Sequence, residues 1–204
     1  SVLAMSFVQG TPVEALVHGS QADRDRIITL LMRLLFQEIF AFRLVQTDPN
    51  ISNYRYNSQT QQLILIDLGA TRAYDASIAD SYRQLMQAAI EQDRELMRQA
   101  AEHIGYFQEQ IRPEQQQAVL DLFQQACEPL CYRGVYDFGN SNLAARMRDA
   151  GMALSMEQDY WHTPPADAIF LHRKLGGLYL LAARLKARVN VHELFMPYWR
   201  QHGA

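Results

Sequence analysis

The sequence predicts a mainly α-helical domain that carries one small β-hairpin. Most of the chain places apolar residues three and four positions apart, the spacing of a helix with one buried face. Capping residues, Pro and Gly divide these stretches into helices of ordinary length. A pair of strand-like runs lies between Tyr54 and Ile66 and is separated by a polar turn.

Length and composition limit the classes of protein that fit. The 204 residues are 49% hydrophobic and 20% charged, which suffices for one packed domain over residues 1–204. A formal net charge of -3 gives no electrostatic footprint for nucleic acid. Cys127 and Cys131 have no nearby His or Cys to complete a metal set, so we expect core thiols. We find no signal peptide and no run that spans a bilayer, which favours a cytoplasmic or organelle-interior location.

The first elements are a strand and a long helix. Residues 2–8 form an apolar run that predicts a strand, which Gly10 and the following Thr-Pro would end. Ser20 with Asp23 resembles a capping box and opens a helix. Its apolar stripe begins at Ile27 and the helix ends near Leu44.

The hairpin follows, with an acid before it and another after it. Tyr54-Arg55-Tyr56 and Leu63 to Ile66 are the two strands, joined by a polar turn. Asp48 lies in the loop that precedes them and is followed five residues later by Asn53. Asp67 comes directly after the second strand. Either acid alone is typical of an ordinary turn. In this order and spacing they indicate a functional site.

The remainder is predicted to be helical. The expected helices are 77–90, 93–104 ended by Gly105, 113 to about 129, 142–150 closed by Gly151, 165–185, and a last one capped by Asn190 and Glu193. Asp137-Phe138-Gly139 has no strand before it, so we interpret it as a loop turn. His172-Arg173-Lys174 points in three directions on a helix, which favours packing over a convergent site.

The order acid, amide, acid matches the chemistry of phosphoryl transfer on a kinase-like lobe. Protein kinases carry H-R-D-x-x-x-x-N and then D-F-G. By this comparison Asp48 faces the acceptor or attacking water, while Asn53 and Asp67 hold Mg²⁺ on the phosphates of ATP. The fold expected is therefore a kinase-like large lobe with the site on its small hairpin.

The same segments resemble the UbiB-type atypical kinases, a family linked to ubiquinone biosynthesis. The resemblance rests on Gln46-Thr47-Asp48-Pro49-Asn50-Ile51-Ser52-Asn53, 65–72, 170–177 and 185–188, and so spans nearly the whole chain. It implies the C-terminal lobe of an ATP- and Mg²⁺-dependent kinase or ATPase. It also implies quinone-precursor lipids or quinone-biosynthesis proteins as partners, in contact with a membrane.

In this comparison the first strand is the end of the small lobe and the hinge. Backbone groups near Phe7 and Val8 would then face the adenine ring. A small lobe with a Lys–Glu ion pair, and the family's Lys-x-Gly-Gln element, are expected upstream. Without them we expect this chain alone to bind Mg-ATP weakly and to be inactive.

Two departures from protein kinases bear on the reaction. Asn50 stands where they place a Lys, and the short stretch from Ala70 to Tyr74 leaves no peptide-docking segment. These changes favour ATP hydrolysis or a small, lipid-like acceptor. They also keep open a second interpretation, a non-catalytic scaffold that binds nucleotide or lipid.

The last long helix, from Pro165 on, is apolar and has Arg184 and Lys186 near its end. This pattern suits a peripheral helix on an anionic membrane. It also suits a core helix whose basic residues reach solvent, and we favour the core helix.

Overall fold

The computed structural model describes residues 7–48, 50–107, 111–156 and 165–199. The helices are α1 (Gln21–Phe36), α2 (Ala76–Glu91), α3 (Arg94–Ile104), α4 (Pro113–Ala126), α5 (Glu128–Cys131), α6 (Leu143–Met156), α7 (Ala166–Arg184) and α8 (Val191–Phe195). The strands are β1 (Thr11–Pro12), β2 (Leu44–Gln46), β3 (Tyr54–Asn57), β4 (Gln62–Leu65), β5 (Thr71–Ala73), β6 (Tyr136–Asp137) and β7 (Arg188–Val189). Short helical turns are η1 (Val13–His18), η2 (Gln37–Phe42), η3 (Ile51–Asn53) and η4 (Met196–Tyr198). The prediction of a mainly α-helical lobe with a small hairpin is confirmed.

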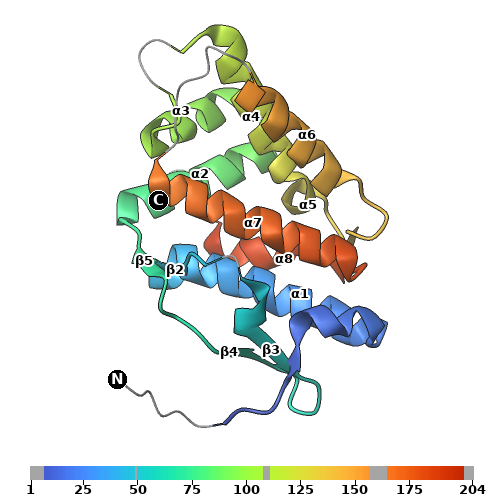
Figure 1. Cartoon of the computed structure of the whole chain (residues 1–204). Coiled ribbons are helices and arrows are strands. Elements are labelled where there is room, and N and C mark those ends of the chain that lie inside the picture. Colours follow the sequence, from blue (N-terminus) through green and yellow to red (C-terminus); the bar gives the residue numbers. More distant parts are fainter. Residues whose placement is uncertain (1–6, 49, 108–110, 157–164, 200–204) are drawn as a thin grey trace.

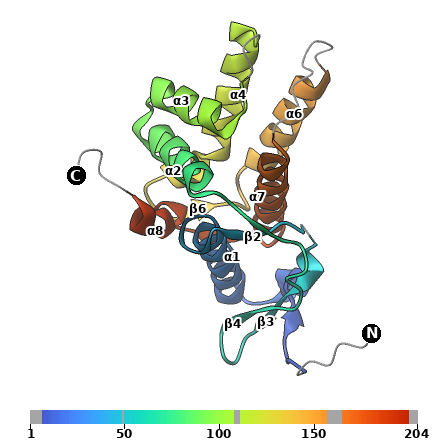
Figure 2. The same ribbon diagram turned by 90° about the vertical axis from the view of Figure 1, so that its left-hand side faces the viewer.

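Helices α1 and α7 form the centre of the molecule, with α8 beside them (Figure 1). The hairpin β3–β4 lies at one end of this centre, and helices α2 to α6 lie at the other (Figures 1 and 2). The inward face of α1 consists of apolar side chains, and so does most of the stripe of α7 that packs nearby. These buried residues are Ile27, Ile28, Leu31, Met32, Leu35 and Phe36 on α1, and Ala168, Leu171, Leu178, Tyr179, Leu181 and Ala182 on α7.

Helix α1 begins and ends as its sequence predicts. The Ser20 side chain accepts a hydrogen bond from the Asp23 amide, which satisfies one of the free N–H groups of the first turn. After Phe36 the helix widens into the π-helical turn η2 and stops at Arg43, whose φ of 53° is left-handed. The chain therefore leaves the helix close to the predicted end at Leu44 and enters β2.

The hairpin forms with the predicted strands. Strand β3 pairs antiparallel with β4, with Tyr54 opposite Leu65 and Asn57 opposite Gln62. Tyr56 is 1% exposed and its hydroxyl donates to Asp23 Oδ1, which fixes the hairpin on the first turn of α1. A separate two-stranded sheet pairs β2 with β5. Both sheets end near the loop that carries Asp48.

The prediction of a strand over residues 2–8 is wrong for its described part, because residues 7 and 8 are not in a strand. Residues 2–6 lie outside the described residues. Phe7 is 89% exposed and Val8 42% exposed. The strand is instead β1, where Thr11 pairs with Tyr56 and Pro12 with Arg55. The pairing partner, which sequence periodicity cannot identify, decides where the strand forms.

Three further predictions about the helical part can be compared with the structure. Helix α6 continues through Gly151 to Met156, since Gly151 keeps a helical backbone and does not act as a cap. A short strand, β6, precedes Phe138, contrary to the expected loop, because Tyr136 pairs with Val189. Cys127 is a buried thiol, as expected, and its burial raises its pKa, whereas Cys131 is only partly buried.

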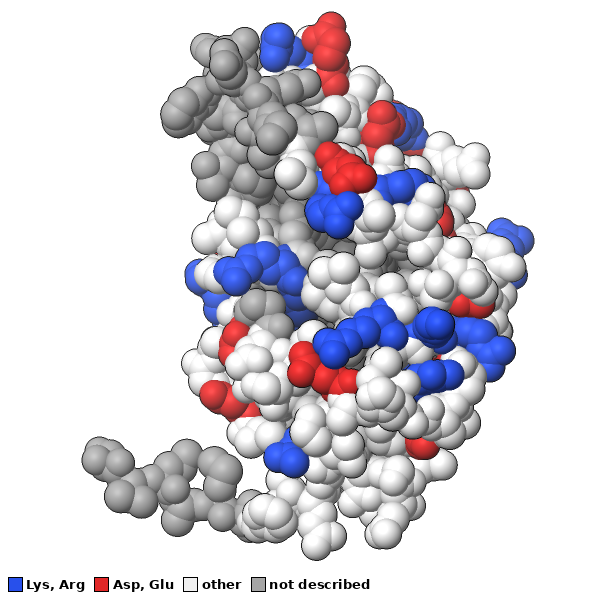
Figure 3. Space-filling view, turned by 45° about the vertical axis from the view of Figure 1, so that its right-hand side comes forward, with Lys and Arg blue, Asp and Glu red and all other residues white. Residues whose placement is uncertain are grey.

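Helix α7 is a core helix, as favoured from the sequence. Its apolar stripe is buried, and the basic residues Arg184, Lys186 and Arg188 at and after its end are exposed. Figure 3 shows Lys and Arg side chains in a band across one face, with acidic side chains beside them. Within the described ranges, no helix has the length and apolar run needed to cross a bilayer.

Candidate functional site

The loop that follows β2 holds Asp48 in a fixed position. The Thr47 amide donates to the Ala70 carbonyl at 3.0 Å, and the Thr47 hydroxyl donates to the same oxygen at 2.6 Å. Asp48 is therefore anchored by its neighbour to the segment that follows Asp67. Its own Oδ1 accepts from the Asn50 amide at 3.1 Å, an Asx turn that closes the loop.

Asp48 and Asn53 are in direct contact. The Asn53 Nδ2 donates to Asp48 Oδ2 at 2.8 Å, and the Asn53 carbonyl accepts from the Ile66 amide at 2.9 Å. The second bond extends the pairing of β3 and β4 by one step, to the residue before Asp67. The backbones of Asn53 and Asp67 consequently lie at the same end of the hairpin.

Asp67 is joined to the first acid through Gln46. The Gln46 Nε2 donates to the Asp67 carbonyl at 3.4 Å, and Gln46 is 2% exposed. The Asp67 side chain is exposed, and its Oδ1 accepts from the Gly69 amide at 2.7 Å. Gln46 thus holds the two acid-bearing segments together, a role that sequence reasoning did not assign to it.

The donor set fits a magnesium ion bound together with phosphates. Asn53 uses its amide nitrogen on Asp48, and its side-chain oxygen is the atom that can ligate a cation. Asp67 offers a carboxylate in an exposed position. Mg²⁺ takes one or two carboxylates plus phosphate oxygens and water. Among the described residues no group of three or more His, Cys, Asp or Glu could hold a metal.

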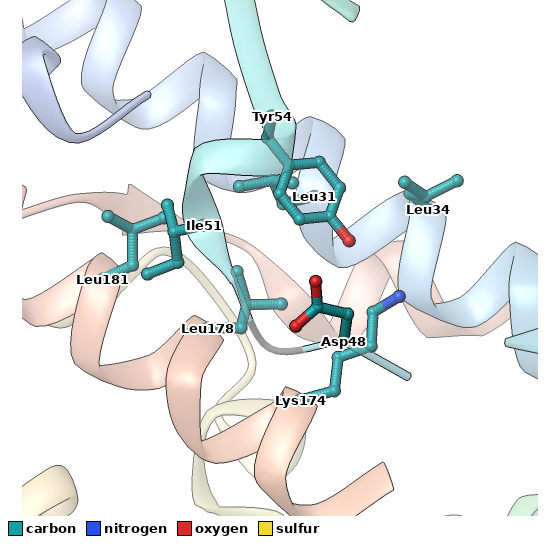
Figure 4. A pocket seen from close by; sticks show the side chains of 8 residues that line it. All are labelled: Leu31, Leu34, Asp48, Ile51, Tyr54, Lys174, Leu178 and Leu181. Atoms are coloured by element: carbon teal, nitrogen blue, oxygen red, sulfur yellow. The ribbon is translucent and has the colours of Figure 1, made fainter. Parts of the chain in front are cut away.

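A small cavity of about 40 Å³ adjoins Asp48 between α1, η3 and α7 (Figure 4). Its lining is apolar except at one end, where Asp48, Lys174 and the Tyr54 hydroxyl gather (Figure 4). The full lining is Leu31, Leu34, Asp48, Ile51, Tyr54, Lys174, Leu178 and Leu181. Burial raises the pKa of Tyr54 to about 12, and the negative charges of Glu38 and Asp48 add to that rise. Tyr54 is therefore a neutral wall of the site.

Lys174 is the site residue that sequence reasoning missed. His172, Arg173 and Lys174 do point apart: His172 bonds the Tyr106 hydroxyl, Arg173 is exposed, and Lys174 pairs with Glu38. The prediction that the triplet does not converge is confirmed, and the packing contact of Lys174 includes a bond from its Nζ to the Gln46 carbonyl at 2.9 Å. No local signal could have shown this contact, since 128 positions separate the two residues.

The second Asp-x-Gly sequence forms a structural turn. Asp137 Oδ1 accepts from the amides of Gly139 and Asn140, and Phe138 is 2% exposed. As predicted, Asp137 is occupied in its own turn. It resembles the Asp67 turn closely, which makes it a useful control.

Phe7 and Val8 are exposed, and a role at the adenine ring stays a prediction for both. The pairing of Thr11 with Tyr56 and Pro12 with Arg55 directs the preceding chain toward the tip of the hairpin. Asn53, the last residue of η3, lies next to the opposite end of strand β3. The grouping of Asp48, Asn53 and Asp67 around one ligand likewise stays a prediction.

A helical lobe with two acids and an amide at one end of a small hairpin defines the class of kinase-like large lobes. The family model described as the ABC1 atypical kinase-like domain matches residues 1–101. The chain belongs to this family of atypical kinases. A solved structure, that of Rv3197 from Mycobacterium tuberculosis in complex with erythromycin, has a TM-score of 0.65 over 93% of this chain and 47% of that one. At 20% identity that likeness concerns the fold alone.

Curated relatives match along nearly the whole chain. The atypical kinase COQ8B, mitochondrial, of Rattus norvegicus is 32% identical over 100% of this chain and 38% of its own length. The atypical kinase coq-8, mitochondrial, of Caenorhabditis elegans is 33% identical over 95% of this chain and 26% of its own. The atypical kinase COQ8, mitochondrial, of Saccharomyces cerevisiae is 31% identical over 96% and 39%. The chain thus spans well under half the length of these relatives.

Proposed function

We propose that this chain is the large lobe of an atypical kinase or ATPase that uses Mg-ATP in support of quinone-lipid biosynthesis. The observation that carries the proposal is the contact of Asp48 with Asn53 at the hairpin end that also bears Asp67. An acid, an amide and a second acid at one end of a hairpin are the groups that phosphoryl transfer requires.

Each residue has one task in this proposal. Asp48, held by Asn53 and by the Thr47–Ala70 bonds, orients the hydroxyl of the acceptor or the attacking water. The Asn53 oxygen and the Asp67 carboxylate would hold Mg²⁺, which when bound neutralises the charge on the phosphates. Gln46 keeps the two segments in register through the Asp67 carbonyl.

The acceptor is proposed to be small, or water. Asn50, in the position where protein kinases carry a Lys, uses its side-chain oxygen on the Ser52 amide at 3.1 Å and so caps η3. The segment after Asp67 pairs at once with β2 through β5 and enters α2 at Ala76. This short connection gives a peptide no docking segment, which favours a quinone-precursor lipid or ATP hydrolysis.

The cellular role follows the family. Relatives from rat, worm and yeast are named mitochondrial, which favours an organelle-interior location for this protein. Partners in quinone biosynthesis and a peripheral membrane contact belong to the same proposal. The exposed Arg184, Lys186 and Arg188 could contribute to such a contact.

A non-catalytic scaffold is the second candidate. It is favoured by the uncharged Asn50, whose side-chain oxygen caps η3. Protein kinases carry a Lys in this position, and an amide offers a transferring phosphate no positive charge. Such a module would bind nucleotide through Asn53 and Asp67 without turning it over.

Mg²⁺-dependent ATP turnover by the intact protein separates the two candidates. The kinase or ATPase predicts turnover that stops when EDTA removes the metal. The Asp48→Asn variant, purified in the same way, gives the background from contaminating ATPases. Saturable nucleotide binding with turnover no higher than this background would favour the scaffold.

A further inference from the structure

We infer that the buried ion pair of Glu38 and Lys174 is a positioning device for both acid-bearing segments of the site. Lys174 is thereby a positioning residue, which acts on Asp48 and Asp67 through the backbone of Gln46. This inference rests on the proposed function for its catalytic consequence. Its structural part can be tested without any activity.

The pair is almost fully removed from solvent. The Lys174 side chain is 10% exposed and the Glu38 side chain 5% exposed, and the two come from α7 and from the π-helical turn η2. Burial raises the pKa of Glu38 and lowers that of Lys174, while the attraction between them opposes both shifts. A buried charge persists in a fold only when it is paired and hydrogen-bonded. A buried pair is weak evidence for stability by itself, so another role has to explain its presence.

A third partner of the ammonium suggests that role. Lys174 Nζ donates to the Gln46 carbonyl at 2.9 Å, and Gln46 also hydrogen-bonds Glu38 through its backbone. Gln46 is the last residue of β2, two positions before Asp48. The pair therefore fixes the peptide from which the Asp48 loop departs.

The same peptide leads to the second acid. The Gln46 side chain donates to the Asp67 carbonyl, and the next residue, Thr47, bonds the Ala70 carbonyl twice. A displacement of Gln46 would consequently move both segments. Lys174 also forms part of the wall of the cavity beside Asp48, together with Leu31 and Leu178 (Figure 4).

A positioning role and a purely structural role of the Glu38–Lys174 pair predict different results for one double variant. In Glu38→Met with Lys174→Met, two apolar side chains of similar length replace both charges. Such replacements are often neutral or stabilising when both partners are removed together. If the ion pair is merely structural, the double variant should keep the turnover of the wild type. If the pair positions the site, the double variant should lose turnover, because Met cannot donate a hydrogen bond to the Gln46 carbonyl.

The experiment uses the intact protein in four forms: wild type, Lys174→Met, the double variant, and Arg173→Met. Arg173 is the matched control, because it is a basic residue on the same helix and is exposed. Three quantities are measured: the melting temperature, the rate of Mg-ATP turnover, and deuterium uptake by residues 44–53 and 66–73.

We expect Lys174→Met to lower the melting temperature and the double variant to recover it. Turnover should stay roughly 10²-fold low in the double variant, since a displacement near 1 Å can have that effect. In the double variant, deuterium uptake should rise in residues 44–53 and 66–73 and stay at the wild-type level in α1 and α7. Arg173→Met should match the wild type in all three.

A double variant with wild-type turnover and wild-type uptake would overturn the inference. So would a double variant that exchanges faster throughout the chain, because the pair would then act on the whole fold. If the wild type itself shows no turnover, the proposed function fails, and uptake in residues 44–53 and 66–73 still decides whether Lys174 positions them.

Discussion

Acid should destabilise this protein through one partly buried histidine, His172 on α7. Its ring stacks on Tyr106 at 5.4 Å between centroids, and its Nε2 bonds the Tyr106 hydroxyl. It also lines an apolar pocket of about 50 Å³ with residues such as Leu35 and Leu175. Burial lowers the pKa of His172 from 6.5 to about 4.

The direction of the effect follows from that pKa. Above pH 6.5 the ring is neutral in the folded and unfolded states, and the full stability is present. As the pH falls below 6.5 the unfolded chain takes up the proton first, so stability is lost until the folded ring titrates near pH 4. Between about pH 7.5 and about pH 5 this amounts to about 2 kcal/mol of unfolding free energy.

The assay is urea denaturation at both pH values for the wild type and for His172→Gln. Gln does not titrate, and its amide can still hydrogen-bond the Tyr106 hydroxyl. We expect the wild type to lose about 2 kcal/mol more than His172→Gln. His103→Gln is the control, because His103 is exposed in the folded state, and it should behave as the wild type. Equal losses in the wild type and His172→Gln would refute the burial argument.

Three further changes test the packing. Lys174→Met should cost about 3–5 kcal/mol because it leaves Glu38 charged and unpaired, and urea denaturation showing under 1 kcal/mol would contradict the buried pair. Phe195→Ala should cost about 3–5 kcal/mol, since this ring is 0% exposed and meets the ring of Phe36; a thermal melt like that of the wild type would show that α8 is not part of the core. Ser20→Ala should cost about 1 kcal/mol through loss of the cap of α1, and Ser20→Gly only a few tenths; equal losses in denaturant would exclude capping as the cause.

Local signals in the sequence were enough to predict most elements. The cap at Ser20, the strands on either side of the polar turn, and the cap at Asn190 each depend on residues within a few positions. The contact of Asp48 with Asn53 lies within five positions and so is also local. This explains why the motif that carries the candidate site can be predicted from the sequence.

Long-range contacts determined what could not be predicted. Lys174 reaches Glu38 over 136 positions, and no local pattern distinguishes it from a basic residue in solvent. The strand expected at Val8 forms instead at Thr11, because Thr11 is the residue that pairs with Tyr56 of β3. Gly151 stays helical for a related reason: a Gly can stop a helix but need not.

The separate roles of Asp48 and Asp67 are the central claim. Asp67→Asn removes a formal charge from the proposed metal shell, so Mg-dependent nucleotide binding by the intact protein should weaken. Asp48→Asn should leave binding largely intact and lower turnover by about 10²–10⁴-fold, as expected for a positioning or general-base group. Asp137→Asn is the matched control, because Asp137 makes the same turn contact to Gly139 as Asp67 makes to Gly69.

The most direct test is one set of calorimetric titrations with Mg-ATP, paired with steady-state ATPase rates, on these three variants of the intact protein. Circular dichroism confirms that each variant is folded. The account predicts lost affinity in Asp67→Asn, lost turnover with retained affinity in Asp48→Asn, and neither loss in Asp137→Asn. Lost binding in Asp48→Asn with unchanged binding in Asp67→Asn would contradict the assigned roles, and unchanged turnover in both would contradict the enzyme itself.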